Sequence, residues 1–160
     1  MGLILKMGMF SYAINLPIFR PTAVATPFGH LPVLEVDGHP LGQSHAIMRF
    51  LARQFGLAGK TPLEEALVDS IADQFADFTA EIRPFFVVAA GFAPGDKEQL
   101  FKDVVLPARE KFFPILEKFL AKGNGYLVGG ALTYADVYIA ENFATGQKLI
   151  SDFYGNHTAI

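Results

Sequence analysis

The stretch 26–44 carries the residues whose types and spacing best fit a binding site. Leu31-Pro32 stands just before a short apolar run. A proline there allows an unusual amide geometry, the cis form included, and leaves nearby backbone groups without ladder partners. Gln43-Ser44 opens an amphipathic run, with Ser44 expected as the N-cap of a helix that presents free N–H groups to an anion. An open strand edge beside a helix N-terminus suits a small peptide that carries a carboxylate.

The elements that must position these residues are short. Residues 32–36 and about 39–42 read as two antiparallel strands, because Asp37-Gly38 between two apolar runs is a strong hairpin signal. A helix is expected over 44–55, and its apolar face is expected to consist of Ile47, Phe50, Leu51 and Phe55.

The rest of the chain indicates helices. A capping box around a proline, Thr61–Glu64, opens a helix expected to reach about residue 90, with Pro84 expected to bend it. A third helix is expected over about 96–122, and a second capping box, Thr133–Asp136, opens a helix through about residue 145. The apolar positions expected inside the two long helices are Leu67, Ile71, Phe75, Phe78, Ile82, Phe85, Leu100, Val104, Phe112, Leu116 and Phe119 or Leu120. Strands followed by helices predict an α+β fold in two parts.

The ordered motifs together resemble the glutathione-binding half of a glutathione S-transferase, most closely the sigma-type and nematode enzymes. That family pattern reads Pro-Phe-Gly-x-x-Pro-x-Leu-x-Val-Asp-Gly, then Gln-Ser, then Arg-Phe-Leu-Ala-Arg, and it stands here at 27–38, 43–44 and 49–53. The likeness runs from about residue 26 to about residue 142. It implies a partial thioredoxin-like half over 1–56, a linker over 57–63 and an all-helical, shortened half over 64–160.

The resemblance also implies roles for individual residues. Gln43 and Ser44 would hold the γ-glutamyl carboxylate of glutathione, and the backbone of Leu31, before Pro32, would pair with the cysteinyl part. His30 stands where relatives carry Gln or Lys and would contact the glycyl end. The alternative for each is purely structural: an ordinary N-cap with a polar neighbour, and a proline that ends a strand.

An acidic row recurs every four residues on the expected second helix, at Glu65, Asp69, Asp73 and Asp77. Such a row either forms a solvated face or meets a cation on a partner. The resemblance implies a homodimer in which Asp77, with Asp73 as the second choice, reaches the ammonium group of the glutathione held by the neighbouring subunit.

The resemblance fails at both ends of the chain. Sigma-type enzymes activate the glutathione thiol with a tyrosine in a strand–helix–strand unit before the Pro-Phe-Gly motif, and only 25 residues precede Thr26 here. Tyr12 is the weak candidate for that role and otherwise a buried aromatic residue; Phe19 and Ala23 stand where the family has its tryptophan and lysine contacts. Two functions therefore stay open: conjugation of glutathione to electrophilic or lipid-derived substrates, and a non-catalytic, dimeric binding or structural role.

The C-terminal part is also shorter than the family pattern, so the helix after Thr133 is expected to show apolar surface unless a partner covers it. A truncated paralogue, a splice product and a faulty gene model would each explain such a chain. The apolar first nineteen residues lack the basic start and cleavage site of a signal peptide, which favours a cytoplasmic protein without membrane contact.

Composition narrows the function further. The chain has no cysteine, so any thiol chemistry must use a thiol brought by the ligand, here glutathione as co-substrate. A net charge of −3 without a basic cluster gives no reason to expect nucleic-acid binding. The four histidines lack metal-ligand spacing, so no metal is expected. Small hydrophobic electrophiles are the second substrates that the resemblance implies.

Overall fold

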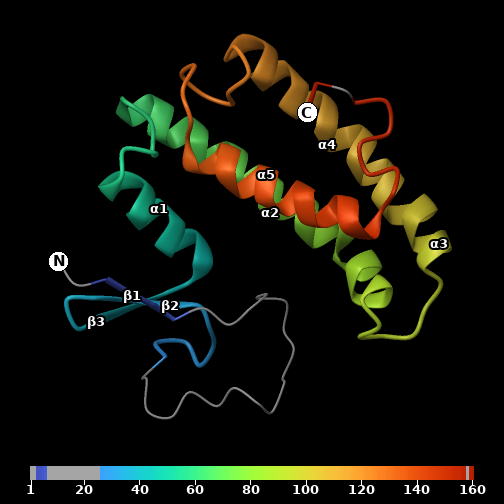
Figure 1. The fold of residues 1–160 in the computed structure, drawn as a ribbon, viewed down its shortest axis with the longest axis horizontal. Coiled ribbons are helices and arrows are strands. Elements are labelled where there is room, and N and C mark those ends of the chain that lie inside the picture. The colour runs from blue at the N-terminus through green and yellow to red at the C-terminus, as the bar shows by residue number, and fades with distance from the viewer. Residues whose placement is uncertain (1–2, 7–25, 158) are drawn as a thin grey trace. The chain divides into compact units, whose positions relative to one another are not determined.

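The computed structural model describes residues 3–6, 26–157 and 159–160 (Figure 1). The chain forms two compact units, residues 1–55 and 56–160. The first contains the sheet and one helix, and the second is helical. This element order confirms the expected α+β class.

The first unit is a three-stranded antiparallel sheet followed by a helix. Its strands are β1 (Leu3–Lys6), β2 (Val33–Val36) and β3 (His39–Gly42), in the order β1-β2-β3, and its helix is α1 (Ser44–Gln54). Asp37 and Gly38 both have positive φ, 48° and 85°, as a type I′ hairpin turn requires.

The two predicted strands and the hairpin turn are therefore confirmed. The apolar face predicted for α1 is wrong in part. Ile47 and Ala52 are its buried residues, whereas Phe55 lies just beyond the helix and is 64% exposed.

The second unit is built on two long helices that lie side by side. These are α2 (Pro62–Ala89) and α5 (Tyr134–Leu149), which pack against each other (Figure 1). Along the chain, α2 and α5 are separated by a continuous helical run. It consists of α3 (Lys97–Leu100), the π-helical turn η1 (Phe101–Val105) and α4 (Leu106–Lys122). The helix α2 continues through Pro84.

Both predicted capping motifs start helices, but only one is a complete box. At α5 the Asp136 carboxylate accepts hydrogen bonds from the backbone N–H groups of Thr133 and Leu127, each at 2.8 Å, and the box is complete. At α2 the Thr61 hydroxyl accepts from the N–H of Glu64 at 3.2 Å. The Glu64 carboxylate accepts instead from the N–H of Lys60, at 2.7 Å, so the reciprocal half of that box is absent.

The burial predicted for the third helical run is confirmed after the π-helical turn, where Phe112 and Leu116 are 3% and 1% exposed. Within the turn the buried residue is Val105 and not Val104, because a π turn accommodates one residue more than an α turn. Val105 and Phe113 are 2% and 0% exposed, whereas the predicted core residues Leu100 and Val104 are only half-buried. On α2 the buried residue is Val68, whereas Leu67, which the sequence predicted to be buried, is 39% exposed.

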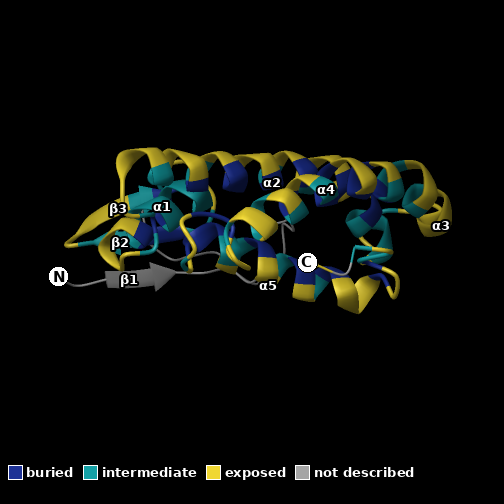
Figure 2. Cartoon of the chain, turned by 90° about the horizontal axis from the view of Figure 1, so that it is seen from above, coloured by how far each residue is buried: buried dark blue, intermediate teal, exposed yellow. Residues whose placement is uncertain are grey.

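Aromatic rings fill the centre of this unit, and the helices carry buried positions, dark blue in Figure 2, between exposed ones. Phe75 on α2 lies 5.9 Å from Phe112 and 5.7 Å from Phe143, measured between ring centroids. Phe113 extends the cluster to Phe143, at 5.0 Å. Such pairs add about 0.5–1.5 kcal/mol each beyond the burial of their area.

Residues 150–157 cover part of α5, so the expectation of an apolar α5 surface open to water is wrong in part. Phe153 is 5% exposed, with its ring 5.1 Å from Phe143 and 5.7 Å from Phe113. Gly146 makes room for that ring, because a Cβ there would lie 2.6 Å from it. Leu149 stays 46% exposed.

A charged cluster fastens the same segment to α4. The buried Arg109 donates to the carbonyl oxygen of Asp152 at 2.8 Å and to the Glu110 carboxylate at 3.0 Å. That second bond holds the pKa of Glu110 below its usual value. The two ring nitrogens of His157 lie 3.1 Å from Glu117 and 3.4 Å from Glu110.

Replacing the covering ring tests this arrangement. Phe153→Ala should lower the free energy of unfolding by about 3 kcal/mol, because it removes a buried aromatic ring and leaves a cavity. The matched variant Leu149→Ala, at an exposed position of the same region, should change it by no more than about 0.5 kcal/mol. Urea denaturation followed by circular dichroism measures both, and equal effects would contradict the packing of Phe153.

Candidate functional site

The pairing of β2 with β3 brings the predicted binding residues to one end of the hairpin. Val33 is paired with Gly42, the last residue of β3. The residues just before Val33 and just after Gly42 therefore lie at the same open end, and they are His30, Leu31, Pro32, Gln43 and Ser44. Five residues predicted from sequence thus converge through one strand register.

The Leu31-Pro32 peptide bond is cis. Both residues are half-buried and stand outside the ladder, which begins at Val33. The prediction of an open strand edge is wrong for β2 itself, because β1 and β3 pair with it on its two sides. The backbone of Leu31 and Pro32, just before β2, lies outside this strand pairing.

Ser44 is the first residue of α1 and not its N-cap, which corrects the prediction. Gln43 occupies the cap position, with φ 74° and ψ 117° and no side-chain capping bond, and its carbonyl oxygen accepts from the N–H of Ile47 at 3.0 Å. The reason is geometric: the chain leaves β3 at Gly42 and must turn within one residue. A non-glycine residue at such a positive φ costs about 1–3 kcal/mol, and strain of this kind concentrates at binding sites.

Gln43 is exposed and Ser44 is half-buried at the start of α1. The first N–H groups of a helix have no partner within it, and the helix dipole places positive potential there. A primary amide, a hydroxyl and these N–H groups can together bind a carboxylate.

The loop before Leu31 packs against the end of β3, a contact that sequence reasoning missed. A Cβ on Gly42 would lie 2.9 Å from the ring of Phe28 and 3.9 Å from Pro27, so glycine is the residue that lets this loop approach. The N–H of Gly29 donates to the carbonyl oxygen of Thr26 at 3.2 Å, and Nδ1 of His30 lies 3.0 Å from the carbonyl oxygen of Phe28. Nothing in the sequence around Phe28 or Gly42 signals this contact.

The remaining predicted residues lie elsewhere. Asp73 and Asp77 are exposed on α2, in the second unit. The acidic row is not one uniform solvated face, because the half-buried Asp69 accepts a hydrogen bond from the Tyr134 hydroxyl at 2.6 Å. Tyr12, like Phe19 and Ala23, lies outside the described residues.

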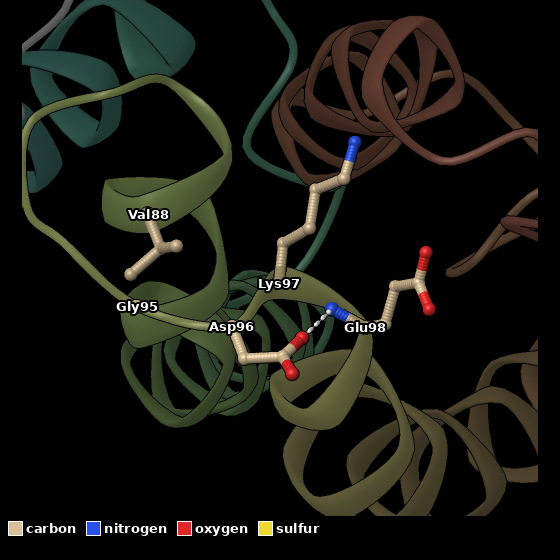
Figure 3. Close-up of a pocket in the computed structure, with 5 residues that line it drawn as sticks. All are labelled: Val88, Gly95, Asp96, Lys97 and Glu98. Carbon is tan, nitrogen blue, oxygen red and sulfur yellow. Dashed lines mark hydrogen bonds between the residues drawn. The ribbon is translucent and has the colours of Figure 1, made fainter.

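A separate solvent-open hollow lies where α2 leads into α3, and its five lining residues are drawn in Figure 3. They are Val88, Gly95, Asp96, Lys97 and Glu98. The Asp96 carboxylate accepts from the N–H of Glu98 at 2.9 Å and so caps α3. This hollow contains none of the predicted binding residues.

The described residues contain neither a metal-binding cluster nor a membrane-spanning helix. Within ranges 3–6, 26–157 and 159–160 no cluster of three or more His, Asp or Glu side chains could hold a metal ion. In the same part of the chain, no helix combines the length and apolar character needed to cross a membrane.

Comparison with known proteins decides the family. Glutathione S-transferase 1 of Ascaris suum is 61% identical over 145 residues, which cover 90% of this chain and 69% of that protein. The chain belongs to the glutathione S-transferase family. The family model "Glutathione S-transferase, C-terminal domain" matches residues 77–155.

Other members of the family agree in sequence and in structure. Probable glutathione S-transferase 5 of Caenorhabditis elegans is 56% identical over 129 residues, 80% of this chain and 62% of that protein. The crystal structure of the glutathione S-transferase from Ascaris lumbricoides superposes with a TM-score of 0.79 at 58% identity, covering 84% of this chain and 66% of that one. Monomeric Na-GST-3 of Necator americanus gives 0.80 at 56% identity, with the same coverage. The chain thus has the family fold and spans about two thirds of the length of these relatives.

The backbone at Gln43 can be tested through stability. Gln43→Gly should raise the free energy of unfolding by about 1 kcal/mol, because the relief of a positive φ exceeds the entropy cost of glycine. Gln54→Gly, the same substitution at a helical position of the same unit, should lower it by about 0.5 kcal/mol. Chemical denaturation measures both values; a loss of stability in Gln43→Gly as large as that in Gln54→Gly would contradict the positive φ.

Proposed function

We propose that this chain binds glutathione and acts as a glutathione transferase, joining the ligand's thiol to small hydrophobic electrophiles or lipid-derived substrates. The observation that carries the proposal is the convergence of His30, Leu31, Pro32, Gln43 and Ser44 at one end of the β2–β3 hairpin. The names of relatives at 61% and 56% identity support it. Glutathione would serve as co-substrate, and no metal is invoked.

Each residue has a role that follows from its chemistry. The Gln43 amide, the Ser44 hydroxyl and the N–H groups at the start of α1 would bind the γ-glutamyl carboxylate, because all of them are hydrogen-bond donors near a positive helix end. The backbone of Leu31, just before the strand, would pair with the cysteinyl residue, as an added strand does. His30, one residue earlier, would contact the glycyl end.

Nematode relatives support the finer assignment to the sigma-type or nematode class. We extend the proposal to a thioredoxin-like domain over 1–56, a linker over 57–63 and a helical domain over 64–160. The cytoplasm is the proposed compartment, and cell fractionation with an antibody to the chain tests it.

A second subunit would complete the site. Asp77, and after it Asp73, would offer a carboxylate to the ammonium group of glutathione held by the other copy in a homodimer. Both side chains are exposed on α2, as such a contact requires. The Necator relative is described as monomeric, so assembly has to be measured for this chain.

A non-catalytic binding protein is the second candidate. It is favoured by one specific observation: Tyr12, the tyrosine that stands before Thr26 in this sequence, is not followed by the Arg-Gly pair that follows the thiol-activating tyrosine in sigma-type enzymes. Such a protein would bind glutathione but leave its thiol mostly protonated at neutral pH, because a free thiol has a pKa of about 8.5.

Binding is tested at Ser44. Ser44→Ala should weaken glutathione affinity about tenfold, because a hydrogen bond to a charged group contributes roughly 1.5–3 kcal/mol. Ser70→Ala, on exposed α2 surface, is the matched control and should bind like the parent. Retention on immobilised glutathione and titration calorimetry give the two measurements.

A folded parent chain that shows no affinity for glutathione would end the proposal. Where the parent binds, turnover of a chromogenic electrophile separates the two candidates. Activity that Tyr12→Phe abolishes supports the transferase, and binding without turnover supports the non-catalytic protein.

The contribution of a second subunit is tested at Asp77. Asp77→Asn should weaken glutathione binding about threefold, as expected for an exposed ion pair. This loss of affinity should occur only where sedimentation velocity shows the chain to be a dimer. Asp103→Asn, an exposed carboxylate on η1, serves as control. A strictly monomeric chain in which Asp77→Asn leaves affinity unchanged would contradict the role in trans.

A further inference from the structure

We draw no further inference here: the strongest candidate, the exposed face of α2 on which Asp77 and Glu81 lie one turn apart and Glu81 pairs with Lys111 of α4 at 3.3 Å, belongs to the subunit contact already proposed for Asp77.

Discussion

The pairing of Val33 with Gly42 is the constraint on which the candidate site depends. It places the cis Leu31-Pro32 bond and the Gln43-Ser44 pair at one end of the hairpin and obliges Gln43 to adopt its positive φ. Val33 and Leu34 are adjacent in β2, so their side chains point to opposite faces, and both are 1% exposed. A slip of one residue would exchange the two faces and disrupt the packing of both side chains. Burial of these two side chains therefore fixes the geometry of a binding site to which neither contributes a polar group.

The helical unit depends in the same way on a carboxylate that does no chemistry. Asp136 binds the N–H groups of Thr133 and Leu127 and so joins the start of α5 to the loop before it. The neighbouring Tyr134 ties the same helix end to Asp69 on α2. These bonds account for both acidic residues structurally, and the aromatic cluster packs between the same helices.

Binding and catalysis rest on different parts of the chain. The groups suited to an anionic peptide lie at the described hairpin, whereas Tyr12, the residue considered for activation of the thiol, lies outside the described residues. Membership of the family supports the fold throughout.

Local patterns in the sequence were sufficient for the hairpin, the Asp37-Gly38 turn, the α5 capping box and the order of the helices. Each depends on residues within about four positions of one another, where propensity and hydrogen bonding act directly. Tertiary structure decided the rest. The sequence could not show that Gln43 and not Ser44 would cap α1, that Phe28 would close on Gly42, or that residues 150–157 would cover α5. These outcomes follow from contacts between distant segments, and a contact of that kind has no signature in the sequence around either partner.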